Sequence, residues 1–225
     1  MTLQHVDILF QLIAFLFAIS IHESAHAWMA NRRGDPTARM LGRISLNPIK
    51  HIDPVGTVLL PLIAVLTHLP AIGWAKPTPV DPRNFKNPVL DDILTSVAGP
   101  VSNFIVATGA TILLALISVA APDGRMIVQG ALAGFVFGNS AFVPLALLLY
   151  QFLVINVLLA VFNLIPVPPL DGSHVLRHFL SERVRQAYDM VGIFGLMALV
   201  FFGGNFLVGL IRPVLHLYTS ILMSI

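Results

Sequence analysis

The sequence has no cysteine and few charged residues. Without cysteine, the chain can form neither disulfide bonds nor a thiolate metal site. Charged residues make up only 11% of the 225 residues, whereas about 25% is usual in soluble domains. The formal net charge of +2 is too small to indicate binding to nucleic acid. Because 56% of the residues are hydrophobic, the composition predicts a polytopic membrane protein with the lipid bilayer as its main partner.

Apolar runs set the expected architecture. Residues 7–30, 93–119 and 142–165 are each long enough to span a bilayer as a helix, and residues 187–225 contain further C-terminal membrane segments. We find no internal repeat, low-complexity tract or soluble domain. The sequence therefore predicts an all-α fold with about 4–6 spans, in which residues 1–225 form a single membrane domain.

The most distinctive motif, His22-Glu23-Ser24-Ala25-His26, ends the apolar run of the first expected helix. Helix positions i and i+4 share a face, so His22 and His26 can both direct imidazole nitrogens at one metal ion. Glu23 lies about 100° further round the helix, near that ion without having to ligate it. Two histidines packed against neighbouring helices are the alternative. Ionisable residues inside membrane helices are costly and by default indicate function, so we interpret the motif as a hydrolytic metal site.

Asp171 is the candidate third ligand, because a hydrolytic zinc site uses three protein ligands and a water molecule. It lies in Pro168-Pro169-Leu170-Asp171-Gly172, after the apolar run 142–165. It can reach the depth of the two histidines if both helices cross the membrane in the same direction. The alternative is a turn or helix-capping role, which the local sequence taken alone favours, because Asp before Gly often caps a following helix. We expect His22, His26 and Asp171 to hold one Zn²⁺ per chain.

Basic residues predict the topology. Five of them lie between residues 31 and 53, which places this loop in the cytoplasm and the site towards the cytoplasmic side. Residues 55–72 must then enter and leave the membrane on one side, as a re-entrant or interfacial hairpin, and residues 126–138 should lie along the outer interface. Residues 40–46 alternate well enough for a short strand. A short β-hairpin or re-entrant element is therefore expected after the first helix.

Other polar residues allow two interpretations each. Asn103, Asn156 and Asn163 lie in apolar surroundings, where an amide can hydrogen-bond between helices or contact the substrate backbone and the oxyanion. Both roles stay open for Asn163, and helix packing is favoured for the other two. His174 and His178 are also four residues apart, but no glutamate follows His174. We expect this second pair on an amphipathic cytoplasmic helix.

Together these motifs resemble the site-2 protease family of intramembrane zinc metalloproteases, peptidase family M50. The resemblance rests on His22-Glu23-x-x-His26, Ala98-Gly99-Pro100-x-x-Asn103 and Asn163-x-x-Pro166-x-Pro168-x-Leu170-Asp171-Gly172. It implies a three-helix catalytic core within about residues 7–180. It also implies His22, His26 and Asp171 as zinc ligands, Glu23 as catalytic acid and base, and Asn163 as a substrate contact. The chain resembles a short member without PDZ-like or nucleotide-sensing CBS domains.

The expected activity is that of a zinc-dependent metalloendopeptidase. Its substrates would be transmembrane proteins or peptides, cut within or next to a membrane segment during regulated intramembrane proteolysis or the clearance of membrane proteins and signal peptides. We expect it in a prokaryotic inner membrane. The alternatives are a metal or proton transporter and a haem-binding membrane protein. Haem ligation has no use for Glu23, and transporters usually show paired repeats. The oligomeric state stays open.

Overall fold

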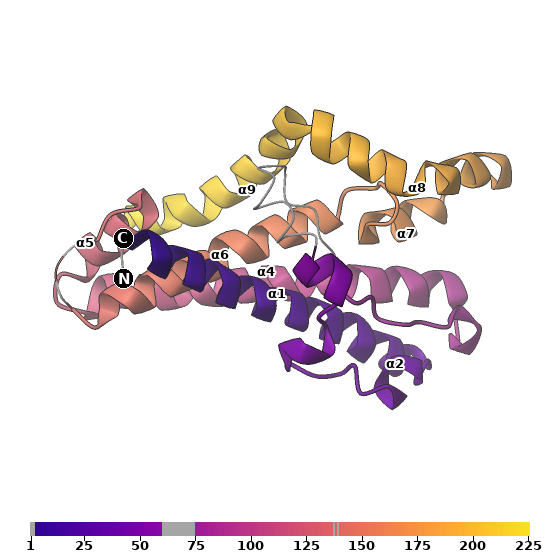
Figure 1. Ribbon diagram of the computed structural model, residues 1–225, viewed down its shortest axis with the longest axis horizontal. Helices are drawn as coiled ribbons and strands as arrows, with labels where there is room; N and C mark the ends of the chain where they lie inside the picture. Colours follow the sequence, from indigo (N-terminus) through magenta and orange to yellow (C-terminus); the bar gives the residue numbers. More distant parts are fainter. Residues whose placement is uncertain (1–2, 60–74, 137, 139) are drawn as a thin grey trace. The chain divides into compact units, whose positions relative to one another are not determined.

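A computed structural model describes residues 3–59, 75–136, 138 and 140–225. Within these ranges the regular elements are all helical and no strand occurs. Four helices are long and apolar enough to cross a membrane, and the bent helix α8, Glu182–Phe202, is a fifth candidate. The four are α1, Leu3–Arg33, α4, Pro88–Ala120, α6, Phe142–Asn163, and α9, Gly204–Ser224 (Figure 1). The all-α polytopic fold is thus confirmed, with a span count inside the predicted range.

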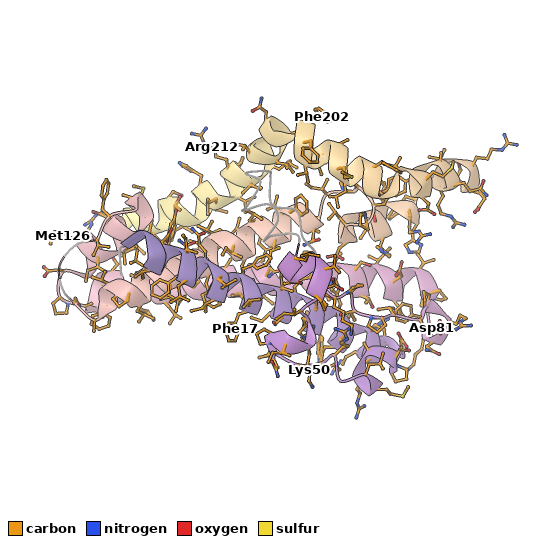
Figure 2. The ribbon with its side chains drawn as sticks, viewed as in Figure 1. Phe17, Lys50, Asp81, Met126, Phe202 and Arg212 are labelled. Carbon is orange, nitrogen blue, oxygen red and sulfur yellow. The ribbon has the colours of Figure 1, made fainter. Side chains whose placement is uncertain are left out.

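The described chain forms two compact units. One contains Met1–Ala18, Asn103–Phe162 and Asn205–Ile225. Its core consists of aliphatic side chains from α4, α6, α9 and the short helix α5, Gly124–Ala133. Leu114, Val128, Leu153 and Leu222 are all at most 1% exposed. Outside this core, many large apolar side chains remain exposed, including Phe17 and Met126 (Figure 2), as expected for helices that contact lipid.

The other unit contains Ile19–Ser102 and Asn163–Gly204. It includes α2, Thr37–Met40, and α7, Asp171–Arg177, together with parts of α1 and α4 and all of α8. Ion pairs hold its helices together. Arg33 at the end of α1 pairs with the fully buried Asp91 of α4, and His178 Nε2 lies 2.7 Å from Asp92 Oδ2. These contacts fix α7 and the end of α1 against the same helix.

Helix α1 ends where a glycine allows the chain to turn. Gly34 has a φ of +116°, which an L side chain rarely adopts. Asp35 N then donates to Ala30 O over 2.9 Å, which satisfies a carbonyl at the helix end. Arg32 and Arg33 in the last turn lie at the negative end of the helix dipole. The histidine motif is therefore followed by about two turns of regular helix before the chain reverses.

The predicted strand at residues 40–46 is wrong. Thr37–Met40 is helical, and the chain after it is irregular. Arg43 donates from Nη1 to Lys50 O over 2.5 Å, and His51 Nε2 lies 2.7 Å from Ser45 O. Side chains thus bind these backbone carbonyls, and no described segment supplies a partner strand. In the predicted 55–72 hairpin, Pro54–Leu59 forms a π-helical turn. The rest, with His68, lies outside the described residues, so the hairpin stays a prediction.

The C-terminal region contains the helices α7, α8 and α9. The helix expected around His174 and His178 corresponds to α7, for which His178 is the C-cap residue, and Ser181 is the N-cap residue of α8. Helix α8 bends by 63° around Gly192, whose φ is +43°. Its last residue, Phe202, is 90% exposed (Figure 2). Helix α9 begins separately at Gly204, so the C-terminal membrane segments expected within residues 187–225 are interrupted there.

Candidate metal centre

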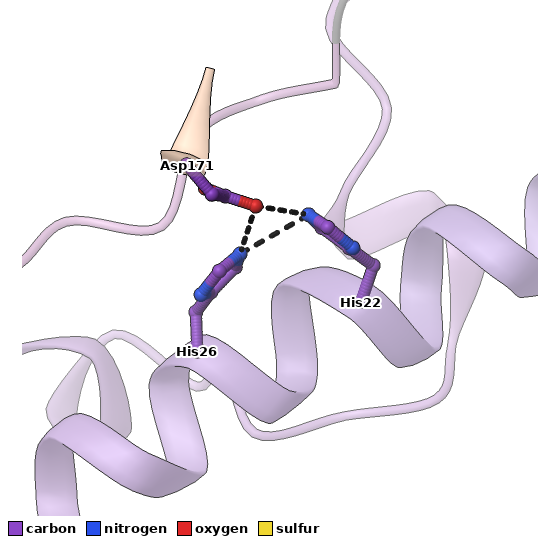
Figure 3. Close-up of side chains that lie close together, drawn as sticks. All are labelled: His22, His26 and Asp171. Carbon is purple, nitrogen blue, oxygen red and sulfur yellow. Dashed lines mark hydrogen bonds and ion pairs between the residues drawn. The ribbon is translucent and has the colours of Figure 1, made fainter. Parts of the chain in front are cut away.

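Helix α1 places two histidines on successive turns, and the start of α7 brings a carboxylate to them (Figure 3). His22 Nε2 lies 3.1 Å and His26 Nε2 3.4 Å from Asp171 Oδ2. The two Nε2 atoms are 3.1 Å apart. Among the residues that the structure describes, these three are the only group of His, Cys, Asp or Glu that could hold a metal ion. The three residues singled out from the sequence therefore meet at one point.

Close backbone packing sets the position of Asp171. At Gly172, an added Cβ would collide with the carbonyl oxygens of Leu164 and Ile165. Only glycine fits this close approach, so the start of α7 lies directly against the turn that follows α6. Asp171 is the first residue of α7, and no side-chain capping bond forms at this terminus. The observed geometry does not use Asp171 as a helix cap, which was the alternative role.

The three side chains fit a bound cation. His22 and His26 are 6% and 7% exposed, and the buried Asp171 Oδ2 accepts no hydrogen bond among the described residues. Three Lewis-base atoms thus face one another without a hydrogen-bond donor to satisfy Oδ2. Two imidazoles and one carboxylate are a donor set that suits zinc with an open fourth position.

The orientation of His26 is set by a backbone contact. His26 Nδ1 lies 2.7 Å from Thr95 O of α4. With the proton assigned to Nδ1 as donor, the Nε2 lone pair is left for the cluster, as in most metal-binding histidines. Thr95 was not identified from the sequence, because a backbone carbonyl leaves no mark in the residue pattern. The contact connects the metal cluster to α4.

Gly99 of α4 lies directly against the two histidines. A Cβ at this position would collide with His26 Nε2 and would lie 2.6 Å from His22 Cε1. Both distances are shorter than real Cβ contacts. We expect Gly99→Ala to displace the imidazoles and to lower zinc affinity by about 10–100-fold, the range typical of disturbed metal surroundings. Zinc titration of the purified protein in detergent measures this change.

Gly109→Ala is the matched control in the same helix. Nothing lies within 4 Å of a Cβ at Gly109, and alanine favours the helix by up to about 1 kcal/mol over glycine. This variant should bind zinc as the wild type does. Equal zinc affinity of Gly99→Ala and the wild type would contradict the packing of Gly99 on the ligands.

Glu23 lies between the two histidines in sequence and is half-buried. Its Oε2 accepts hydrogen bonds from Thr78 N over 3.0 Å and from Thr78 Oγ1 over 2.8 Å. The proline-rich character of residues 76–82 suggests an extended segment, but sequence reasoning gave no sign that Thr78 contacts Glu23. The remaining oxygen, Oε1, accepts no hydrogen bond from the described residues. Within the described part of the chain, Glu23 therefore has one oxygen held by Thr78 and one without a hydrogen-bond donor.

The asparagines occupy two different settings. Asn103 Nδ2 donates to Asn156 Oδ1 over 2.7 Å and lies 3.3 Å from Ala18 O. Asn156 Nδ2 donates to Phe152 O, and both side chains are fully buried. These bonds correspond to the helix-packing role. Asn163 ends α6 and is partly buried. Substrate contact by these three residues stays a prediction.

The second histidine pair faces a different partner. His178 Nε2 and His174 Nδ1 lie 2.7 Å and 3.8 Å from Asp92 Oδ2. Neither histidine belongs to the cluster of His22, His26 and Asp171. The pair thus joins α7 to α4 beside the metal cluster.

Comparison with known proteins agrees with the motif. The model of peptidase family M50 matches residues 10–202. "Putative zinc metalloprotease YwhC" of Bacillus subtilis is 38% identical over 183 residues, which cover 81% of this chain and 74% of the relative. "Putative zinc metalloprotease Rip2" of Mycolicibacterium smegmatis is 26% identical over 199 residues, or 88% of this chain and 68% of the relative. No solved structure matches the chain significantly.

Proposed function

The chain belongs to peptidase family M50, and we propose that it is a zinc metalloendopeptidase of the His-Glu-x-x-His type that cuts transmembrane substrates. The observation that carries this proposal is the cluster of His22, His26 and Asp171, which lies in a protein with several candidate membrane-spanning helices. Glu23 follows His22 directly in the sequence. The names of the two relatives, both described as zinc metalloproteases, support the choice of metal and reaction.

The proposed chemistry divides between a metal and one carboxylate. Zinc, when bound, supplies a Lewis acid and lowers the pKa of a water molecule towards neutrality. His22, His26 and Asp171 would hold one zinc ion per chain. Glu23 takes the proton of the attacking water on its available oxygen and later delivers it to the leaving amine. Asn163 is the proposed contact for the substrate backbone.

The membrane setting determines the substrate class. The ligating histidines belong to a candidate membrane span, Val6–Arg33, so the substrate must reach the site from the bilayer. A helical substrate hides its carbonyl groups in its own hydrogen bonds, and it must unwind before it is cut. We therefore propose transmembrane proteins or peptides as substrates, either in regulated intramembrane proteolysis or in clearance of membrane proteins and signal peptides. The proposed location is a prokaryotic inner membrane, with the site towards the cytoplasm.

Removal and return of the metal tests the proposed reaction. We expect a chelator to abolish cleavage of quenched-fluorescent transmembrane peptides in detergent, because Glu23 alone does not activate water sufficiently. One equivalent of Zn²⁺ should restore the rate, whereas Mg²⁺, which prefers oxygen ligands in octahedral geometry, should not. Cleavage that continues in the zinc-free protein would contradict the proposed function.

A further inference from the structure

An extended segment crosses the proposed acid–base residue and is fixed at both ends. We call residues 75–81 the Thr78 strap. At one end Lys76 N donates to His51 O over 2.9 Å. At the other, Asp81 N donates to Asp35 Oδ2 over 2.8 Å. Both anchors lie in the region that follows α1, so the strap returns to the helix that carries the histidine motif.

At the second anchor, the carboxylate of Asp35 accepts four hydrogen bonds. Asp35 is fully buried, and besides Asp81 it accepts bonds from Thr37 N, Thr37 Oγ1 and Asn84 Nδ2 at 3.1, 2.5 and 2.9 Å. Burial works against ionisation, but these donors outweigh it and lower the pKa of Asp35. A charged acceptor with four donors holds its partners firmly. The strap is therefore attached to a well-defined point.

At the centre of the strap, only Thr78 has a backbone N–H group that can donate a hydrogen bond. Thr78 lies between Pro77 and Pro79, which have fixed φ angles and no N–H group. Within residues 77–79, Thr78 therefore supplies the only backbone donor, and this donor reaches Glu23 Oε2 over 3.0 Å. Thr78 Oγ1 lies 2.8 Å from the same oxygen and 3.0 Å from Glu23 O. The proline pair fixes the backbone on both sides of this contact.

We propose that Thr78 is a positioning residue for Glu23, holding its carboxylate so that the second oxygen faces the attacking water. This inference rests on the proposed function and adds a residue to it. With Oε2 held by two donors, the side chain has little freedom to rotate, and Oε1 stays available for the proton. Loss of the Thr78 hydroxyl removes one donor and leaves the carboxylate free to turn away from the water. The backbone donor cannot by itself fix the carboxylate plane.

Two engineered cysteines test the contact independently of activity, because the chain has no native cysteine. The variant Glu23→Cys with Thr78→Cys should form a disulfide in membranes treated with a mild oxidant, because Thr78 Oγ1 lies 3.0 Å from the backbone oxygen of Glu23 and disulfides join residues whose Cα atoms are about 4.4–6.8 Å apart. Trp28→Cys with Thr78→Cys is the control. Trp28 lies five residues after Glu23, about 140° round the helix, and is 47% exposed. A Trp28 pair that links as readily as the Glu23 pair would overturn the contact.

Kinetics of Thr78 variants test the positioning role. In cleavage of a quenched transmembrane peptide, Thr78→Val should lower kcat by about 10–100-fold, as for other supporting residues of metal sites, with KM and zinc content unchanged. Thr78→Ser keeps the hydroxyl and should restore most of kcat. Thr111→Val is the control, because Thr111 Oγ1 bonds within its own helix to Ala107 O. Unchanged kcat in Thr78→Val, or equal losses in the Ser and Val variants, would overturn the inference.

Glu23→Gln, measured in the same assay, separates this inference from the proposed function. If Glu23→Gln is inactive and Thr78→Val is fully active, Glu23 acts without help from Thr78. If Glu23→Gln cleaves normally, the proposed function itself fails. Loss of zinc from Thr78→Val would show a structural role and would also overturn the positioning role.

Discussion

Replacing Glu23 with glutamine is expected to stop peptide cleavage while leaving zinc in place. Glutamine has the size of glutamate, and its carbonyl oxygen can still accept from Thr78 N, which lies 3.0 Å from Oε2 in the wild type. It cannot take a proton from water. General-base catalysis contributes about 10²–10⁴-fold, so the cleavage rate should fall by at least that factor. The rate on a quenched transmembrane peptide and the zinc content of the same sample measure both effects.

Glu182→Gln is the matched control for this experiment, because Glu182 is the only other glutamate in the chain. It is exposed at the start of α8 and pairs with Arg185. Exposed ion pairs contribute about 0–1 kcal/mol, so this variant should fold and cleave as the wild type does. Cleavage by Glu23→Gln at the rate of the control would contradict the role given to Glu23.

Replacing Asp171 with alanine is expected to release the metal. His22 and His26 alone leave the site one protein ligand short of a hydrolytic zinc centre, and the two Nε2 atoms would lose the only anionic group in the cluster. Loss of an outer-shell partner typically costs 10–100-fold in metal affinity. Loss of a ligand should therefore cost more than about 100-fold. Competition with a fluorescent zinc chelator measures the change.

Asp189→Ala is the corresponding control. Asp189 is an exposed residue of α8 whose carboxylate pairs with Arg177 over 3.2 Å. Its removal should leave zinc affinity unaltered. If Asp171→Ala binds zinc as tightly as Asp189→Ala, Asp171 is a structural turn residue, and the topology inferred from its depth loses its basis.

Local periodicity explains which features were predictable from the sequence. The long spans follow from apolar length alone, and the position of His22 and His26 on one helix face follows from their four-residue spacing. Asp171 was found by ligand count, because few candidates remained once two histidines were placed. Each of these inferences needed only neighbouring residues or a chemical requirement.

Contacts between distant segments could not be read from the sequence. Thr78 lies 55 residues from Glu23, and no pattern in a single sequence connects them. Gly99 was noted only as part of the Ala98-Gly99-Pro100 motif, and its contact with the two imidazoles was not predictable. The strand predicted at residues 40–46 failed for a similar reason. Alternation shows that a segment is suited to a sheet, but a strand also needs a partner, and the described part of the chain supplies none.

Zinc K-edge X-ray absorption of the purified protein tests the central claim most directly. We predict one zinc per chain with two imidazole nitrogens at about 2.0–2.1 Å and oxygen ligands at about 2.0–2.2 Å. The imidazole signal should vanish in the double variant His22→Ala, His26→Ala and persist in His174→Ala, His178→Ala. The opposite pattern, with zinc retained by the first variant and lost by the second, would contradict a metal centre built from His22, His26 and Asp171.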